Sequence, residues 1–459
     1  MTTRRDFLAR TALAAAGLSA VTRDAIGVVP HWWVRPATDP ATGLRDTPDR
    51  LPIAWYRDCI RRLQTKLGEQ GLDGMLLRDR WDIIYVSGYF HTTTERPYGL
   101  WIPRDGEPTI FVPGLDRELV NAWWIRDAEL YFDYPQAQTN GDPRVGSVLS
   151  PVGTVNLWAW MMKGLEERGF GSKNIALDWD PPASQLAALQ AAVPQAKLTP
   201  KPDLVMGMRM VKTPDEIALT QRAIDYHDRM LDFCHSYVVD HGTDATDFDV
   251  GHAAEKFGTD LVMRDVAHDG RAHSAAGVSI ECSVRTGVAT AYPHPNQFFY
   301  EKIARGQAIQ FSGVMVRIGG YGGEGYRACH IPPITPEQER LWDVHTEMTL
   351  AQQAESKAGV ECRMAGARVM EIARRNHVEQ YVFHRPAHGE GMEGHQPPYL
   401  SLGDPTVLQE NMMLSNEPGL YNVEGGYGYN HGNNLLVGKD RARQMNQTPM
   451  TKEWCFIKI

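Results

Sequence analysis

A stretch at residues 383–398 gathers three histidines and two acids in a segment too rich in glycine and proline to form a helix. His388 and His395 lie seven residues apart, and Glu417 follows after a short spacer, just before a Pro-Gly turn. Imidazoles and a carboxylate at neighbouring strand ends can bind a metal ion or transfer protons. Two surface loops with incidental histidines are the alternative, but two such segments in succession favour a functional site.

Further polar residues precede and follow this stretch. His294 stands between two prolines in a turn, and Glu324 and Arg327 lie on a strand that a glycine-rich hairpin introduces. The glycine-rich run, residues 319–325, lacks the Gly-Lys-Ser/Thr ending of a phosphate loop and no helix follows it, so we reject a nucleotide site. His431 lies in the last predicted hairpin and strand. The candidate chemistry is therefore concentrated in the second half of the chain.

Composition places the chain among soluble globular proteins of more than one domain. It has 459 residues, of which 42% are hydrophobic and 22% are charged, and its net charge is -9. This acidic balance argues against a nucleic-acid partner. The six cysteines are scattered without a C-x-x-C pair, which argues against a zinc ribbon or a redox motif.

The N-terminus carries the pattern of an export signal. Arg4 and Arg5 precede Asp-Phe-Leu and a short apolar, alanine-rich run at residues 11–21. Twin arginines before such a run are typical of Tat signals, and the run is too short for a stable transmembrane helix. We expect a signal peptide at 1–30, a leader arm at 31–52 and a soluble periplasmic protein without a membrane span.

Helix and strand patterns alternate through residues 53–205, which predicts an α/β domain of ordinary size. Apolar residues at helical spacing predict an amphipathic helix at Ala54–Gln70. Short apolar runs at 74–77, 99–103 and 109–113 predict buried strands.

A second domain, residues 206–459, begins with a long helix. Thr213 is suited to the N-cap, Pro214 to the first helical position and Glu216 to the capping box. We expect this helix to end near Val239. Further helices are predicted at 246–258, 336–358 and 363–377.

In its order of segments, the chain resembles the creatinase, prolidase and methionine aminopeptidase superfamily. The resemblance implies an α/β fold with a creatinase-like N-terminal domain followed by a C-terminal pita-bread domain. The loop at Glu95–Tyr98 is similar to a creatinase loop that reaches the neighbouring subunit, which implies a homodimer. The six segments that carry the main resemblance are Met208–Ile217, Tyr292–His294, Gly320–Arg327, Ala387–Gly391, Gly394–Pro398 and Asn416–Tyr421.

The departures from the superfamily concern the metal ligands. The peptidase branch holds two metal ions with two Asp, one His and two Glu. The first Asp position falls at Ser312 or Gly313 in this chain, and the last Glu position falls at Gly432. Two divalent ions repel strongly unless bridging carboxylates neutralise them, so we infer that the two-metal site is absent. No cofactor is expected; one divalent ion stays chemically feasible on Glu324, His388 and Glu417, with His431 as an additional ligand.

The resemblance also implies roles for individual residues. His294 matches the position of the creatinase histidine and is expected to be the general acid and base. The carboxylates are expected to orient water or a cationic group, and the other two histidines to bind the developing oxyanion. The full expected catalytic set is His294, Glu324, His388, His395 and Glu417. The expected substrate-binding set is Arg96, Tyr98, Tyr321, Arg327 and His431.

Four functions follow from this comparison. The first is a hydrolase that cleaves a C–N bond in a small polar molecule by histidine-based catalysis. Creatine is not the expected substrate, because the positions of creatinase's carboxylate pair fall near Gly322 and Tyr326 in this chain. An Arg that creatinase carries after the second histidine segment falls near Tyr399. The alternatives are an Xaa-Pro aminopeptidase-type metallopeptidase, a non-catalytic binding protein, and a lyase in which His294 or Tyr321 abstracts the proton.

Overall fold

The computed structural model places the predicted export signal, residues 1–30, and the leader arm up to residue 48 outside the part of the chain that it describes. Within that part, no helix is both long and apolar enough to span a bilayer. The described residues are 49–90, 94–131, 156–266, 277–294 and 300–459.

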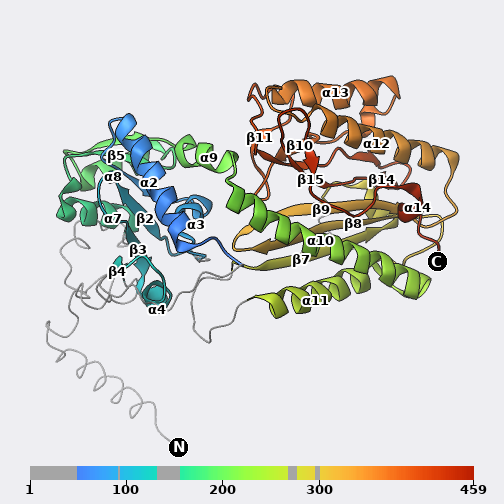
Figure 1. The fold of residues 1–459 in the computed structure, drawn as a ribbon, viewed down its shortest axis with the longest axis horizontal. Helices are drawn as coiled ribbons and strands as arrows, with labels where there is room; N and C mark the ends of the chain where they lie inside the picture. Colours follow the sequence, from blue (N-terminus) through green and yellow to red (C-terminus); the bar gives the residue numbers. More distant parts are fainter. Residues whose placement is uncertain (1–48, 91–93, 132–155, 267–276, 295–299) are drawn as a thin grey trace, which may run out of the picture.

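A six-stranded mixed sheet forms the centre of the first half, on the left in Figure 1. Strands β1, β2 and β3 are buried at every position, which explains why their sequences are continuous apolar runs. The three strands predicted in this half are confirmed with their bounds. In spatial order the strands are β4 (Asp127–Tyr131), β3 (Thr109–Pro113), β2 (Gly99–Pro103), β1 (Gly74–Leu77), β5 (Asn174–Leu177) and β6 (Lys197–Pro200).

Helices cover both faces of this sheet. Met75 and Leu77 pack into the same cluster as the buried face of α2 (Ile53–Glu69), whereas Leu76 packs with the residues of the helices on the other face. Alternate residues of one strand therefore serve two hydrophobic layers. The other helices of this half are α3 (Arg80–Ser87), α4 (Arg117–Asn121), α7 (Leu157–Leu165) and α8 (Ala183–Ala192).

The second half is built from two antiparallel sheets between pairs of helices. Helices α10 and α11 lie against the sheet β7-β8-β9, and α12 and α13 lie on the opposite side of the half (Figure 1). The strands of the first sheet are β7 (Ser279–Thr286), β8 (Ala308–Ile318) and β9 (Tyr321–His330). The second sheet has the order β11 (Gln396–Tyr399), β10 (Ala387–Gly389), β12 (Met413–Asn416), β15 (Asn433–Leu436) and β16 (Arg443–Gln444).

The helix predictions for this half are confirmed. Most ends shift by no more than three residues, but the helix predicted at 246–258 continues to Asp265. A short hairpin, β13 (Leu420–Asn422) and β14 (Tyr427–Tyr429), leads into β15. A final short helix, α14 (Lys452–Cys455), ends near the C-terminus. The four long helices are α10 (Pro214–His241), α11 (Asp247–Asp265), α12 (Pro336–Glu355) and α13 (Cys362–Arg375).

The predicted capping box at the junction is confirmed. The Glu216 amide donates to Thr213 Oγ1 at 3.4 Å, and the Thr213 amide donates to Glu216 Oε2 at 2.7 Å. Trp55 of α2 donates its indole N–H to the same Thr213 hydroxyl at 3.1 Å. The start of α10 is therefore tied to the first half of the chain.

A buried arginine makes a second tie between the halves. Arg209, on α9 (Asp203–Met210), donates to Asp82 of α3 at 2.9 Å and to Glu393 at 2.7 Å. Its Nη2 also lies 3.3 Å from Gln396 Oε1. Glu393 and Gln396 flank the segment that carries His395, so this charge network holds that segment against the first half.

Three histidines of the second half are buried as acceptors of backbone hydrogen bonds. His227 Nε2 accepts the Val316 amide at 2.6 Å, and His345 Nε2 accepts the His431 amide at 2.8 Å. His431 Nδ1 in turn accepts the Ala328 amide at 3.2 Å. Burial lowers the pKa of His227 and of His345 to about 3, and it lowers the pKa of His431 well below its usual value. The fold therefore requires the neutral imidazoles.

This requirement predicts acid sensitivity. Folding depresses the pKa of each of these histidines, so each takes up a proton on unfolding in mild acid. Its contribution to the free energy of unfolding is therefore complete above pH 6.5 and is lost as the pH falls towards the pKa of the folded state. Each of these histidines then lowers the free energy of unfolding by about 1.4 kcal/mol per pH unit below its unfolded pKa. Urea denaturation between neutral and mildly acidic pH measures the slope. His345→Gln should reduce the slope of the free energy of unfolding against pH by about one proton. His252→Gln, at an exposed histidine, should leave the slope unchanged. A free energy of unfolding that does not depend on pH in this range would contradict the account.

Candidate functional site

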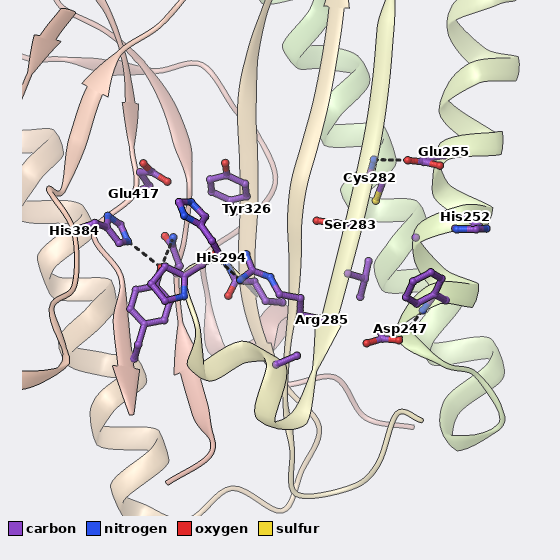
Figure 2. A pocket seen from close by; sticks show the side chains of 18 of the residues that line it. Asp247, His252, Glu255, Cys282, Ser283, Arg285, His294, Tyr326, His384 and Glu417 are labelled. Atoms are coloured by element: carbon purple, nitrogen blue, oxygen red, sulfur yellow. Dashed lines mark hydrogen bonds between the residues drawn. The ribbon is translucent and has the colours of Figure 1, made fainter. Parts of the chain in front are cut away.

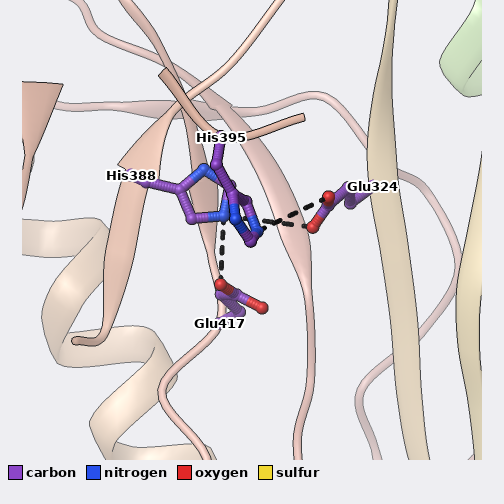
Figure 3. A group of neighbouring side chains, drawn as sticks. All are labelled: Glu324, His388, His395 and Glu417. Atoms are coloured by element: carbon purple, nitrogen blue, oxygen red, sulfur yellow. Dashed lines mark ion pairs between the residues drawn. The ribbon is translucent and has the colours of Figure 1, made fainter. Parts of the chain in front are cut away.

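Four of the predicted catalytic side chains converge in the second half, as Figure 3 shows. Glu324, His388, His395 and Glu417 each offer a nitrogen or oxygen atom, and these atoms all lie within 4.8 Å of one another. Glu324 comes from β9, His388 from β10, His395 from the residue before β11 and Glu417 from the residue after β12. Segments that are far apart in the sequence therefore supply one cluster.

Strand pairing explains how His388 meets Glu417. In the antiparallel pair β10–β12, His388 lies opposite Ser415 and the Glu417 amide donates to the Pro386 carbonyl at 2.8 Å. His388 and Glu417 are therefore diagonal neighbours across the pair, a separation that long side chains can bridge. Their charged atoms, His388 Nε2 and Glu417 Oε1, are 3.0 Å apart.

An asparagine of the second sheet fixes Glu324 on the first sheet. Asn434 Oδ1 accepts the Glu324 amide at 3.1 Å, and Asn434 Nδ2 donates to the Glu324 carbonyl at 2.9 Å. This close approach depends on Gly323, where a Cβ would lie 1.9 Å from Asn434 Oδ1. The Asn434 side-chain amide thus links the two sheets by hydrogen bonds and holds the Glu324 carboxylate beside His388.

The orientation of His388 is set by the backbone. Its Nδ1 donates to the Gly389 carbonyl at 3.0 Å, so Nε2 faces Glu417 and also lies 4.0 Å from Glu324 Oε2. Burial alone would lower the pKa of His388, but Glu417 and Glu324 outweigh it and raise the pKa. Burial alone would raise the pKa of Glu417, but His388 lowers it. Each member of the pair therefore shifts the pKa of the other in the direction that favours an imidazolium beside a carboxylate.

Two further acids, Glu324 and Glu390, interact with this pair, and the pKa of each is raised. Burial and the charge of Glu417 raise the pKa of Glu324, which accepts a hydrogen bond from the Tyr326 hydroxyl at 2.5 Å. Burial and the charge of Glu324 raise the pKa of the fully buried Glu390 well above its usual value. The site thus limits how many carboxylates carry a charge at once.

His395 is the more exposed histidine of the cluster. Its ring lies edge-on to His388 with centroids 4.2 Å apart, and its Nε2 is 4.0 Å from Glu324 Oε1. Burial and the neighbouring charge of His388 lower the pKa of His395 to about 4. At neutral pH it is therefore uncharged and is able to donate or accept a hydrogen bond towards the adjacent cavity.

A cavity of about 740 Å³ adjoins the cluster (Figure 2). His294, the fifth predicted catalytic residue, is exposed and lines this cavity together with Glu417 and His395. The cavity lies between the β7–β9 sheet, helix α11 and the segments after β10 and β12. The five predicted catalytic residues are therefore gathered at one place, four in the cluster and one beside it.

Sequence reasoning missed other cavity residues. Tyr421 accepts a hydrogen bond from Asn430 Nδ2 at 3.0 Å, and its hydroxyl lies 2.9 Å from His384 Nε2. Arg285 and Arg385 add two guanidinium groups to the lining. His384 and Arg385 belong to the histidine-rich stretch itself and could have been found there, whereas Arg285 lies on β7 and shows no signal in its sequence neighbourhood.

Three of the predicted substrate-binding residues are core residues instead. Arg327 is fully buried and donates to backbone carbonyls, those of Gly432 and Thr448 among them. Tyr321 donates to Glu216 Oε1 at 3.0 Å, beneath the start of α10, and His431 lies in the buried backbone network described above. None of the three lines the cavity. Their predicted contact with substrate is therefore wrong in this conformation, and the reason is that their side chains point into the core.

The other two predicted substrate-binding residues belong to the first half. Arg96 pairs with Glu95 at 2.8 Å, and Tyr98 is buried with its ring 6.2 Å from that of Tyr89. Neither lines the cavity of its own chain. Their predicted action in a neighbouring subunit stays a prediction, as does the homodimer.

The two positions at which carboxylates were predicted to be missing are filled by other contacts. A Cβ at Gly432 would lie 2.0 Å from Cδ2 of Tyr326, so the tyrosine ring occupies the space of a side chain at 432. Ser312 Oγ accepts a hydrogen bond from Arg285 Nε at 2.9 Å. An aromatic ring thus stands beside position 432, and a guanidinium beside Ser312, which with Gly313 is one of the two candidate positions for the other missing carboxylate.

Comparison with known proteins covers most of the chain. Residues 60–211 match the creatinase/prolidase N-terminal domain family, and residues 219–439 match metallopeptidase family M24. An Xaa-Pro dipeptidase of Lactobacillus delbrueckii subsp. lactis is 23% identical over 369 residues, which are 79% of this chain and 89% of that protein. Creatinase of Bacillus sp. (strain B-0618) is 22% identical over 417 residues, 86% of this chain and 92% of the enzyme.

Solved structures support the same fold. A prolidase from Thermococcus sibiricus superposes with a TM-score of 0.70 at 19% identity, over 88% of this chain and 99% of the prolidase. At this level of identity the likeness shows the architecture alone. The two halves seen in Figure 1 therefore correspond to an arrangement that solved structures of this type share.

The contact between Tyr326 and Gly432 is testable by a double-mutant cycle. Gly432→Ala should lower the free energy of unfolding by about 1–3 kcal/mol, because the new methyl group overlaps the ring. Adding Tyr326→Ala should remove most of that penalty, which appears as a coupling energy in urea denaturation. Gly403→Ala is the matched control, since a Cβ there meets no atom within 4 Å. Equal penalties with and without Tyr326 would contradict the steric interpretation.

The ion pair of His388 and Glu417 predicts a shift in titration. Glu417→Gln removes the main group that raises the pKa of His388, so burial should then lower it. NMR titration of the imidazole measures this pKa in both proteins. Glu424→Gln, an exposed change on the β13–β14 hairpin, should leave the His388 titration where it was. An unchanged His388 in Glu417→Gln would show that the pair is not charged as described.

Proposed function

The chain belongs to the creatinase, prolidase and methionine aminopeptidase superfamily, and we propose that it cleaves a C–N bond in a small polar substrate without a two-metal centre. Its fold is that of the superfamily, a creatinase-like N-terminal domain followed by a pita-bread domain. The observation that carries the proposal is the convergence of Glu324, His388, His395 and Glu417 beside a cavity that His294 also lines.

A pair of metal ions does not fit the residues present. Two closely spaced divalent ions need several carboxylates, some of them bridging, to balance their charge. The first Asp position, Ser312 or Gly313, and the last Glu position, Gly432, provide no carboxylate. The Tyr326 ring lies against Gly432, and the Arg285 guanidinium is hydrogen-bonded to Ser312. A guanidinium would in addition repel a cation bound there. The donor set is therefore too small and too weakly charged for the two-ion chemistry of the peptidase branch.

The residues present support hydrolysis by acid and base catalysis. Water would form a bond from its oxygen to the carbon of the scissile C–N bond while His294 accepts its proton. The same imidazole would then give this proton to the nitrogen as the C–N bond breaks, so atoms and charge balance. Glu417, held by His388, would orient the water, and neutral His395 would donate a hydrogen bond to the oxygen that gains charge.

A single-ion peptidase is the second candidate function. Two carboxylates and two imidazoles are enough ligands for one divalent ion, and their atoms lie close enough to bind it together. These ligands belong to Glu324, His388, His395 and Glu417. His388 would present Nε2 because Nδ1 is engaged by the Gly389 carbonyl. One bound ion would supply Lewis-acid polarisation of a peptide carbonyl. The similarity to an Xaa-Pro dipeptidase favours peptides as substrates in this case.

We also propose the organisation expected from the sequence. Residues 1–30 would direct Tat export to the periplasm, 53–205 and 206–459 would form the two domains, and two chains would associate as a homodimer. What supports export is the twin-arginine pattern before an apolar run. What supports the domain boundary is that residues 201–213 separate the first sheet from the first long helix of the second half.

The role of His294 is tested with a panel of small amides, dipeptides such as alanyl-proline among them. Wild-type protein should release the amine product from at least one of them, and His294→Ala should lower kcat by about 100-fold or more through loss of proton transfer. His252→Ala changes another exposed histidine that lines the same cavity and should retain activity. Equal loss in both variants, or no loss in either, would refute the assignment.

Solvent labelling separates hydrolysis from elimination. In water enriched in heavy oxygen, hydrolysis places one labelled oxygen in the acid product, whereas elimination places none. Mass spectrometry of the product gives the answer directly, and an unlabelled product would replace the proposed reaction by a lyase.

Chelation distinguishes the two candidate functions. Activity that survives prolonged dialysis against a chelator supports the metal-free reaction, because the proposed proton transfers use side chains only. Activity that is lost on dialysis and restored by one equivalent of a divalent ion supports the single-ion peptidase instead. Melting temperatures before and after dialysis serve as the control for loss of folded protein.

A further inference from the structure

Two cysteines that are far apart in the sequence meet at the wall of the cavity. Cys234 lies on α10 and Cys282 on β7, and their Sγ atoms are 3.8 Å apart although the two residues are 48 positions apart in the chain. Both side chains belong to the hydrophobic core between the β7–β9 sheet and its two helices. The fold thus pairs two thiols that show no pairing motif in the sequence.

The cavity reaches one member of this pair. Among the cysteines, all of which lie in the described part of the chain, only Cys282 lines the cavity, and 7% of its surface is exposed. Its backbone N–H donates to Glu255 Oε1 of α11 at 3.1 Å (Figure 2). Cys234 is fully buried on the far side of the Cys282 thiol. A small molecule that enters the cavity therefore meets Cys282 first and Cys234 only through it.

The other four cysteines lack this combination of a neighbour and a route. Cys329 on β9 and Cys455 on α14 are hydrogen-bonded to each other, but both are fully buried and neither lines the cavity. Cys59 on α2 and Cys362 on α13 are fully buried as well. These four thiols serve as internal references for access from the cavity.

We propose that Cys282 and Cys234 form a thiol-modification site, at which a small organic disulfide that enters the cavity oxidises the pair to a protein disulfide. The inference goes beyond the proposed function and needs neither the histidine cluster nor hydrolysis. The resulting bond would tie β7, which forms part of the cavity wall, to α10. The export proposed above would favour this state, because disulfides persist in oxidising compartments.

The chemistry is two successive thiol–disulfide exchanges. The Cys282 thiolate would attack one sulfur of the small disulfide, so that a bond forms to Cys282 while the S–S bond of the reagent breaks and one half leaves as a thiolate. The Cys234 thiolate would then attack Cys282 Sγ, which joins the two cysteines and releases the second half. Two protein thiols are oxidised and one small disulfide is reduced to two thiols, which take up the two protons that the cysteines lost.

Two features of the pair set the conditions for this reaction. The Sγ atoms must approach from 3.8 Å to about 2.05 Å, and rotation of the Cys282 and Cys234 side chains about χ1 supplies this movement. The hydrogen bond with Cys282 and burial raise the pKa of Cys234 well above its usual value, so its thiolate is scarce and the closing step is slow. Long incubation at mildly alkaline pH is therefore appropriate.

The test incubates the reduced full-length protein overnight with bis(2-hydroxyethyl) disulfide. The reaction is stopped with acid, the intact mass is measured, and free thiols are then blocked with N-ethylmaleimide in denaturant before peptide mapping by mass spectrometry. The wild-type protein should lose two of its six thiols and the mass of two hydrogen atoms. The map should show one linked pair of peptides, joined through Cys234 and Cys282, and the other four cysteines should carry the blocking group.

Variants separate the two exchanges. Cys234→Ser should stop at the first step and retain one half of the reagent on Cys282. Cys282→Ser should leave every remaining cysteine as a free thiol, because Cys234 is then unreachable. Cys329→Ser, which changes the other hydrogen-bonded pair, is the matched control and should still form the bond between Cys234 and Cys282.

Three results on the wild-type protein would overturn the inference. The first is recovery of all six thiols from the folded protein under conditions in which the urea-denatured protein reacts fully. The second is a mixed disulfide that accumulates on Cys282 without linkage to Cys234. The third is linkage of Cys329 to Cys455 to the same extent. Because these results need no substitution, a variant that does not fold leaves the test decisive.

Discussion

The constraint on which the site depends is the burial of Glu324 and Glu417 beside one another. Two carboxylates in a poorly solvated place cannot both stay charged without a cation between them. His388 meets this need from β10, with Nε2 3.0 Å from Glu417 and 4.0 Å from Glu324. The directions in which the pKa values of all three groups are shifted follow from that arrangement, which favours a proton on His388.

The residues around the cluster fix the position of Glu324 and fill the neighbouring space. The Asn434 side chain is hydrogen-bonded to the backbone N–H and C=O of Glu324. The Tyr326 hydroxyl donates to the Glu324 carboxylate, and the Tyr326 ring fills the space beside Gly432. The ring packs so closely against position 432 that a larger side chain there would be sterically costly. The Arg285 guanidinium, which is hydrogen-bonded to Ser312, would repel a cation bound beside that residue. These two contacts support the proposal that the site does not hold two ions.

The sequence predicted the fold class, the long helices, the buried strands of the first sheet and the convergence of the catalytic residues. It failed for side chains whose direction depends on register. On β9, Glu324 and Tyr326 are two residues apart and face the site, whereas Tyr321 and Arg327 are an odd number of residues from Glu324 and point into the core. Strand alternation could have excluded both and identified Tyr326. Arg285 could not be found in this way, because its place in the cavity lining depends on a contact with Ser312 across the β7–β8 pair.

The central claim is that a proton and at most one cation balance the carboxylates of this site. Elemental analysis of the full-length protein, purified without chelators and after exposure to a mixture of divalent ions, tests it most directly. The account predicts no more than one tightly held ion per chain. Two ions per chain, retained through dialysis and lost together in Glu417→Gln, would contradict it and restore the chemistry of the two-metal peptidases.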